Sequence, residues 1–293
     1  MISTDTSANV THNGARPEEY LEAASDARAQ SLQWLGVYLA VSGVSLVLAD
    51  HRGLAALHAG TVLVVGWSLF SRGRLARVVG DLLPLFVAPA LYGEIPMLIA
   101  AMGTTYHDSL VQRWEVLVFG GQPSRELAGR FPISGISELL HFGYLAYYPA
   151  IFAPPLILYA RRKTHEFAET VLVLTKIYLL CWVSFVLLPV EGPRYLWGTP
   201  AGVPDGAVRR LAARILAAGS SRGAAFPSSH MAVMVGQTML ALRWQRRVGY
   251  ALAVMSVLVG VGAVYGGFHY AVDMVAGALL GVVCAATILR HSP

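Results

Sequence analysis

A histidine and an aspartate four residues apart stand at the start of an apolar segment near the C-terminus. They are His269 and Asp273, in the stretch GGFHYAVDMVAG. Residues at this spacing share one face of a helix, so we expect the two side chains to meet. A carboxylate beside an imidazole fixes the tautomer of the ring and supports its use as a nucleophile. Taken alone, the pair would equally suit a cap at the end of a membrane helix.

A proline, two serines and a second histidine form another motif, written PSSH. Pro227, Ser228 and Ser229 predict the start of a helix, where N–H groups and the helix dipole favour an anion. His230 lies in the first turn, beside this anion site. Upstream, Arg194 in the run GPRY offers a planar fork of donors suited to phosphate oxygens. Each motif alone is an ordinary turn or helix cap.

Together these residues predict phosphoryl transfer without a metal or another cofactor. We expect His269 to attack phosphorus and form a phosphohistidine, while Asp273 orients its ring. His230 would protonate the leaving oxygen and then activate the acceptor. Side chains with suitable donors would hold the phosphoryl oxygens; these are Arg194, Ser228 and Ser229. The sequence contains neither a P-loop nor the Cys/His spacing of a zinc site.

The composition is that of a membrane protein. Of the 293 residues, 55% are hydrophobic and 13% are charged, whereas soluble proteins carry about 25% charged residues. The net charge of +5 therefore indicates basic loops between spans rather than nucleic-acid binding. We expect an all-α polytopic protein with about eight transmembrane helices, a polar cytoplasmic tail at residues 1–30 and a single membrane domain at residues 31–293.

Eight apolar segments have about the length that is needed to span a membrane. They are Ser31–Ala49, Leu54–Phe70, Leu82–Met102, Ile133–Ala160, Phe167–Val190, Ser228–Trp244, Val248–Phe268 and Tyr270–Leu289. In addition, Pro17 followed by acidic residues looks like a helix start that leads into the first span.

The charges of the loops predict an orientation. With eight spans, every short basic loop falls on one face, which the positive-inside rule makes cytoplasmic together with both termini. The three polar motifs then fall together on the opposite, extracytoplasmic face. This convergence follows from counting spans and indicates one active site in a bacterial inner or plasma membrane.

Further polar side chains occur inside the predicted spans. Glu138, His141 and Tyr148 share one helical stripe near the active face, where they could bind a polar head group or an acceptor. Hydrogen bonds between helices are the alternative. Glu94 lies deep in the third span and requires a partner that the sequence does not identify.

The motifs FPSSH (226–230) and HYAVD (269–273) resemble those of the type 2 phosphatidic acid phosphatase superfamily. The resemblance implies a helical catalytic core at about residues 167–290 and a phosphohistidine mechanism. The HY-x-x-D form, the PRY turn and Tyr265, which we expect to contact substrate, look most like the inositol phosphorylceramide synthase and sphingomyelin synthase branch and its bacterial relatives.

The sequence departs from the superfamily pattern at two phosphate-binding cations. Leu187 stands where a lysine is usual, and Ala263 stands where an arginine is usual. The synthase-like branch often lacks both cations too. Arg222, just before the second motif, is a candidate replacement that would bind phosphate, although it could equally be a solvated loop residue.

We therefore expect a membrane lipid phosphotransferase or phosphatase. Its partners would be membrane lipids, among them a phosphorylated lipid that is the substrate. From this lipid it would move a phosphoryl or phospho-head-group unit to an alcohol, such as an inositol-like polyol, or to water. A plain phosphatase for phosphatidic acid or polyprenyl phosphate is the alternative. A transporter or scaffold that keeps the fold without catalysis is a further one, and no nucleic-acid partner is expected.

Overall fold

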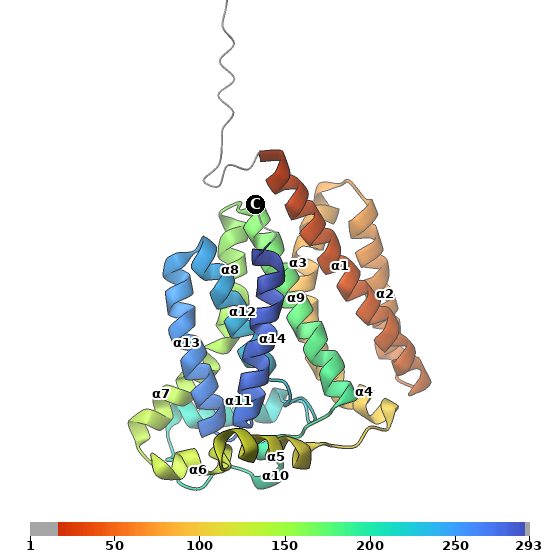
Figure 1. The fold of residues 1–293 in the computed structure, drawn as a ribbon. Coiled ribbons are helices and arrows are strands. Elements are labelled where there is room, and N and C mark those ends of the chain that lie inside the picture. The colour runs from red at the N-terminus through yellow and green to blue at the C-terminus, as the bar shows by residue number, and fades with distance from the viewer. Residues whose placement is uncertain (1–16, 291–293) are drawn as a thin grey trace, which may run out of the picture.

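Helices form the whole fold of residues 17–290, which are the residues that the computed structural model describes (Figure 1). Six helical segments in this part of the chain are long and apolar enough to cross a membrane. They are α1 (Pro17–Leu48), α2 (Arg52–Phe70), the α3–α4 unit (Arg74–Met102), α9 (Thr164–Leu187), α13 (Arg246–Tyr265) and α14 (Ala271–Leu289). The all-α polytopic membrane architecture is thus confirmed.

The first helix is longer than the first predicted span. α1 begins at Pro17 and carries Glu18 and Glu19 in its first turn, where acids favour the positive end of the helix dipole. The predicted helix start at Pro17 is therefore confirmed, and the helix runs through the second half of the predicted tail. The first half of that tail, residues 1–16, lies outside the described residues.

The third predicted span is a broken helix. α3 (Arg74–Ala90) ends in a short 3₁₀ turn, η1 (Leu91–Glu94), before α4 (Ile95–Met102) continues. Pro84 and Pro89 lie inside α3, and each removes a backbone donor from the helical ladder. The break lets Tyr92 accept the N–H of Ser221 while Glu94 meets His58 of α2.

The predicted count of eight spans is not supported by helix length. The fourth predicted span is two shorter helices, α7 (Ser134–Leu145) and α8 (Tyr147–Ala160), separated at Ala146. The sixth is α12 (Ser229–Trp244), which has 16 residues. A continuous apolar run in the sequence does not reveal where a helix is interrupted, since hydropathy averages over the break.

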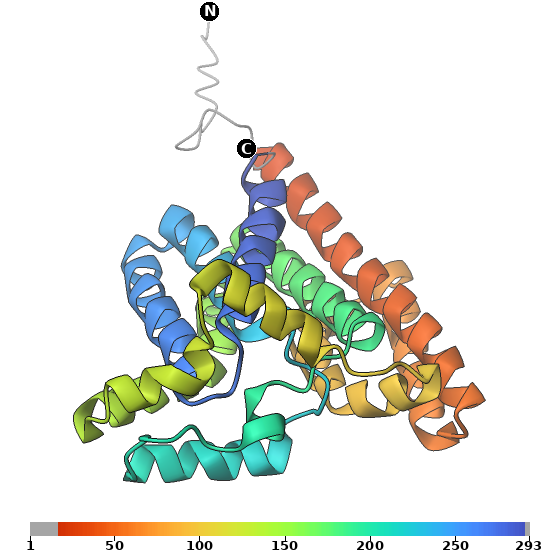
Figure 2. The ribbon, with the colours of Figure 1, turned by 60° about the horizontal axis from the view of Figure 1, so that its bottom comes forward.

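Four further helices lie across one end of the bundle. They are α5 (Asp108–Phe119), α6 (Pro123–Arg130), α10 (Pro193–Trp197) and α11 (Ala207–Gly219). Figure 2 brings this end forward. The first turn of α1 and the last turn of α14 lie at the opposite end (Figure 1).

Small residues bring α12 and α14 unusually close together. A Cβ atom on Gly277 would lie 2.3 Å from the carbonyl oxygen of Ser228, and one on Gly281 would lie 2.4 Å from that of Ala232. Only glycine permits this approach, as is common where membrane helices pack. The crossing places the beginning of α12 directly against the beginning of α14, and both of these carry predicted catalytic residues.

Candidate active site

The segment just before Arg194 and the loop that leads to Ser228 are joined by backbone hydrogen bonds; they are called the arginine loop and the serine loop. Val190 donates its N–H to the Gly223 carbonyl at 3.1 Å, and its own carbonyl accepts from Ala225 N–H at 3.0 Å. Gly192 follows with a φ of 90°, and a Cβ there would lie 3.2 Å from the Cβ of Ala225. A glycine is thus required for the segment that leads into α10, which contains Arg194, to approach the loop that leads into α12.

Ser228 caps α12 and ties it to the third motif. Its hydroxyl accepts the N–H of Met231 at 3.3 Å, so the predicted helix start at the serines is confirmed, with Pro227 just outside the helix. The N–H of Ser228 donates to the Asp273 carbonyl at 3.0 Å. The serine motif and the HYAVD motif are therefore fixed to each other through their backbones.

His269 and Asp273 meet, although not in the way that a single helix would bring them together. α14 begins at Ala271, so His269 lies in the turn before the helix and not on its face. Its Nδ1 lies 3.0 Å from the Ala225 carbonyl and 3.3 Å from Asp273 Oδ2. Both neighbours are acceptors, so we assign the proton to Nδ1 and leave a lone pair on Nε2. Within residues 17–290 nothing hydrogen-bonds to that Nε2.

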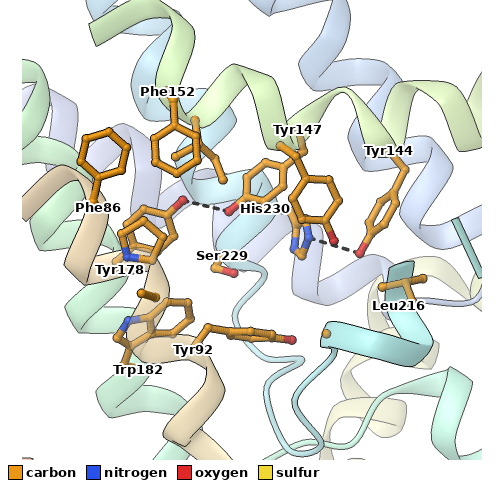
Figure 3. Close-up of a pocket in the computed structure, with 15 residues that line it drawn as sticks. Phe86, Tyr92, Tyr144, Tyr147, Phe152, Tyr178, Trp182, Leu216, Ser229 and His230 are labelled. Carbon is orange, nitrogen blue, oxygen red and sulfur yellow. Dashed lines mark hydrogen bonds between the residues drawn. The ribbon is translucent and has the colours of Figure 1, made fainter. Parts of the chain in front are cut away.

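His230 packs against His269 with their ring centroids 5.5 Å apart. The ring stacks on Tyr144 and lies 4.2 Å, centroid to centroid, from the ring of Tyr147. Its Nε2 lies 3.2 Å from the Tyr144 hydroxyl, as the dashed line in Figure 3 shows. Its Nδ1 is buried without a hydrogen-bond partner in the described part of the chain. One nitrogen of this imidazole is therefore available to exchange a proton with a bound molecule.

Arg194 lines a small cavity of about 30 Å³ together with both histidines. It is the one arginine or lysine among the described lining residues, and its Nη1 donates to Ser220 Oγ at 2.8 Å. The structure thus brings the predicted phosphate-binding arginine to the predicted nucleophile. The same cavity is lined by a carboxylate, that of Glu191.

Arg222 lies at the rim of the site instead of inside it. Its guanidinium pairs with Glu191 and packs over the rings of Tyr106 and Tyr195. The side chain is 56% exposed, and the hydrogen bond and charge of Glu191 raise the pKa of Arg222. Arg222 therefore neutralises Glu191 in this structure, and it does not line the cavity beside Arg194.

An apolar pocket of about 310 Å³ adjoins His230 (Figure 3). His230 and Ser229 line it together with aromatic rings, among them those of Phe86, Phe152 and Trp182. The predicted residue Tyr148 also lines this pocket, whereas Tyr92 and Tyr144 line both this pocket and the small polar cavity. A molecule with a polar end and an apolar chain could occupy both spaces at once.

Three of the predicted substrate-binding residues do not line either space. The Glu138 carboxylate accepts the N–H groups of Val208 and Arg209 at 2.9 and 3.1 Å, which caps α11. His141 Nδ1 lies 2.7 Å from the carbonyl of Ser137, one turn earlier on its helix. Both side chains are thus hydrogen-bonded within the fold, and contact of Glu138 or His141 with substrate stays a prediction.

The third of these residues is Tyr265. It is 1% exposed, and its hydroxyl donates to the Phe131 carbonyl at 3.0 Å. Conversely, sequence reasoning missed Tyr92, Tyr147 and Glu191, which do line the site. The signal for Tyr147 was present, since tyrosines at positions 144, 147 and 148 in an apolar run are typical of a polar wall inside a membrane. Among the described residues no cluster of His, Cys, Asp and Glu is arranged to hold a metal ion.

The fold and the site together define an all-α membrane protein whose two histidines, aspartate and arginine meet at one end of a helical bundle. A family model described as the PAP2 superfamily matches residues 134–287, which is more than half of the chain. The chain therefore belongs to the PAP2 superfamily. The matched region contains α7 to α13 and most of α14, and it leaves out α1 to α6.

A curated relative matches over a shorter stretch. The bacitracin transport permease protein BcrC of Bacillus licheniformis is 32% identical over 68 residues, which are 23% of this chain and 34% of that protein. The chain thus matches about a third of the length of this relative. No solved structure matches the chain.

Proposed function

We propose that this protein is a membrane lipid phosphotransferase or phosphatase that works through a phosphohistidine on His269. The observation that carries the proposal is the meeting of His269, Asp273 and His230 between a small cavity that contains Arg194 and an apolar aromatic pocket. The polar cavity suits a phosphate group and the apolar pocket suits a lipid chain.

The first chemical step uses the free lone pair of His269. Nε2 attacks phosphorus while the bond from phosphorus to the lipid oxygen breaks. His230 donates a proton to the departing oxygen, and Asp273 stabilises the positive charge that develops on the His269 ring. Arg194 and the N–H groups at the start of α12 hold the phosphoryl oxygens as their charge grows.

The second step reverses these roles. His230, now without its proton, takes a proton from the acceptor hydroxyl, whose oxygen attacks phosphorus. The phosphorus–nitrogen bond breaks and returns His269 to its starting form. Water as acceptor gives hydrolysis, and an alcohol gives a transferred phosphoryl or phospho-head-group unit.

The charge of the cavity supports transfer from a phosphodiester lipid. Glu191 is already paired with Arg222 at the rim, so Arg194 is the cation of the cavity that is left for a phosphate, and the positions of the usual cations hold the exposed Leu187 and the buried Ala263. One arginine suits the single negative charge of a phosphodiester better than the double charge of a phosphomonoester. The HY-x-x-D form of the third motif also supports an inositol-like polyol or a similar alcohol as acceptor.

The proposed orientation puts the site on the extracytoplasmic face. Arg72 and Arg161 lie between helices and Arg247 lies in the first turn of α13, all at the end opposite to the site, and basic residues at short connections favour the cytoplasm. Both termini are then cytoplasmic as well. Accessibility of engineered single cysteines to a reagent that does not cross membranes would test this arrangement.

Transport is the second candidate, because the matched relative is named as a transport permease. A protein that only transports or recognises a lipid phosphate has no need of a nucleophile, an orienting carboxylate and a second histidine together. The complete set of His230, His269 and Asp273 therefore favours catalysis.

The test is an assay of purified protein in detergent with a panel of phosphomonoester and phosphodiester lipids, with and without inositol and other polyols. Free phosphate, the released lipid alcohol and phosphorylated forms of the added alcohol are all followed, and His269→Ala is the control. A phosphorylated product that requires the added alcohol, and whose formation is lost in the variant, would establish transfer. Free phosphate alone, equally lost in the variant, would establish a phosphatase. Activity that His269→Ala does not change would overturn the proposal.

A further inference from the structure

Helix α5 carries two buried carboxylates beside the candidate site, although it lies before the region that the family model matches. Asp108 is 6% exposed and Glu115 is fully buried. A buried acid is costly unless strong hydrogen bonds compensate for its lost hydration. Both residues have such partners, and most of these lie in the two segments that contain Arg194 and His269.

Asp108 joins the arginine loop to the turn of the nucleophile. Its Oδ2 accepts the N–H of Glu191 at 2.9 Å, and its Oδ1 accepts the N–H of Gly192 at 2.9 Å and the hydroxyl of Tyr270 at 3.0 Å. Gly192 lies two residues before Arg194, and Tyr270 follows His269 directly. One carboxylate therefore links the segment that holds the phosphate to the segment that attacks it.

Glu115 holds the first turn of α14. Its Oε1 accepts the N–H of Ala271 at 2.8 Å, while Asp273 Oδ2 accepts the N–H of Tyr270 at 2.8 Å. Two carboxylates from different helices thus satisfy successive free amides at the positive end of one helix. Burial raises the pKa of Glu115 to about 7, and the nearby charge of Asp273 adds to this shift.

We propose that Asp108 and Glu115 are positioning residues for the reaction, and that α5 sets the separation between His269 and Arg194. The proposal rests on the function proposed above for this site. Neither carboxylate touches the reacting atoms. Each acts through the backbone or through Tyr270, so that a phosphate bound by Arg194 lies within reach of His269 Nε2. Misplacement by about 1 Å is enough to cost about 100-fold in rate.

The two carboxylates differ in what a conservative change removes. Asp108 receives three donors on two oxygens, so Asp108→Asn must place an amide NH₂ against at least one of those donors. Glu115→Gln, in contrast, keeps an oxygen that can accept from Ala271, whereas Glu115→Ala leaves that amide unpaired. This difference gives a graded set of variants.

The experiment compares these variants in the purified full-length protein. We expect Asp108→Asn and Glu115→Ala to lower kcat by about 10–100-fold with KM within about 2-fold, because positioning matters most in the transition state. Glu115→Gln should recover most of the loss from Glu115→Ala. The matched controls are Asp205→Asn and Glu126→Gln, which change exposed acids with ion pairs to nearby arginines and should keep wild-type kcat.

Binding of orthovanadate, a phosphate analogue, supplies a readout without turnover. Affinity should fall in Asp108→Asn and Glu115→Ala and should remain unchanged in both controls. Wild-type values of kcat and of vanadate affinity in both α5 variants would overturn the inference. If wild type and His269→Ala do not differ in either measurement, the proposed function fails and the inference fails with it.

A gentler variant keeps the test decisive if Asp108→Asn does not fold. Tyr270→Phe removes only the hydroxyl that reaches Asp108 and leaves the buried ring in place. We expect kcat to fall by about 3–10-fold, with the melting temperature lowered by only a few degrees. If Asp108→Asn does fold, it can be combined with Tyr270→Phe. The fold-loss of kcat in this double variant should be smaller than the product of the two single-variant losses, because the two residues share one hydrogen bond. A wild-type kcat in both Tyr270→Phe and Glu115→Ala would count against positioning.

Discussion

Three pairs of histidine and carboxylate are buried among residues 17–290, and besides His165 and Glu169 they lie in the candidate site and between α2 and η1. His269 and Asp273 meet at 3.3 Å in the candidate site, and His58 and Glu94 meet at 2.7 Å between α2 and the 3₁₀ turn η1. All four side chains are less than a tenth exposed. Burial and residue type are thus the same, and neither can explain why only one pair is proposed to react.

The difference lies in how many of the polar atoms are already occupied. His58 Nδ1 lies 3.2 Å from Ser42 Oγ and 3.3 Å from the carbonyl of Leu39, while its Nε2 meets Glu94. The other oxygen of Glu94 accepts the hydroxyl of Tyr38 at 3.2 Å. Every hydrogen-bonding atom of this pair therefore has a partner, as a purely structural network requires.

The pair in the candidate site is incomplete by the same measure. Within residues 17–290, His269 Nε2 has no hydrogen-bond partner, and Asp273 Oδ1 is buried without one. Buried polar atoms left without partners are rare, and a bound ligand or a catalytic role is one explanation for them. We call His58 and Glu94 the closed pair, and His269 and Asp273 the open pair. We infer that the closed pair stabilises the fold, and the open pair is the one proposed to supply the chemistry.

Removing the nucleophile from the open pair should have the largest effect. His269→Ala leaves the Arg194 loop and the cap of α12 intact, so we expect the protein to fold. We also expect kcat for either phosphate release or transfer to fall by at least about 10,000-fold. The rate is measured with the best lipid of the panel, and gel filtration in detergent checks the fold. A residual rate within about 10-fold of wild type would remove the distinction between the two pairs.

Removing the histidine from the closed pair should act on stability instead. His58→Ala leaves the Glu94 carboxylate without its main partner inside an apolar bundle, and breaking a buried pair in this way typically costs about 3–5 kcal/mol. We expect a lower melting temperature in detergent, with kcat per folded molecule within about 2-fold of wild type.

The control for this prediction is Lys163→Gln, which alters an exposed ion pair with Glu166 and should change stability little. A His58→Ala protein that melts as wild type does but loses activity would show that the closed pair participates in the function after all.

The sequence was sufficient to predict which catalytic motifs meet. His230, His269 and Arg194 fall on one face once the spans alternate, because each helix must return the chain to the other side of the bundle. The local caps were also predictable, since Ser228 and Pro17 have side chains with strong positional preferences. These features depend on neighbours in the sequence or on the order of spans.

The sequence could not predict contacts that depend on where helices break and cross. Glu94 was recognised as needing a partner, but His58 is brought to it by the packing of α1 and α2 and by the break at η1. Glu138 was placed on the right helix, yet its side chain turns to the start of α11. Asp108 was not predicted at all, because its role appears only when three distant segments are brought together.

The pH dependence of stability should distinguish Glu115, which lies beside the candidate site, from exposed acids with ordinary pKa values. Its pKa is raised from 4.5 to about 7 in the folded protein, chiefly by burial. The protonated form therefore favours folding below about pH 4.5, and this contribution is lost as the pH rises through about 7. The loss is about 3 kcal/mol in size, because one pKa unit corresponds to about 1.4 kcal/mol.

The measurement is thermal unfolding in detergent between about pH 5 and about pH 8. Wild type should lose more stability across this range than Glu115→Gln, whose side chain does not titrate. Glu126→Gln is the matched control and should follow wild type. Parallel curves for wild type and Glu115→Gln would mean that Glu115 titrates alike in the folded and unfolded states.

The smallest effect is expected at Tyr265, which the motif resemblance assigns to substrate and the structure assigns to the fold. Its hydroxyl donates to the carbonyl of Phe131 and lines neither cavity. Tyr265→Phe should therefore cost about 1 kcal/mol of stability, the usual net value of one hydrogen bond, and should leave kcat and KM unchanged. Tyr144→Phe is the useful contrast, because that hydroxyl contacts His230 inside the site and its loss should lower kcat with little change in stability. Equal losses of kcat in the two variants would mean that Tyr265 acts in the candidate site, since a hydroxyl that serves only the fold does not alter the rate of the folded enzyme.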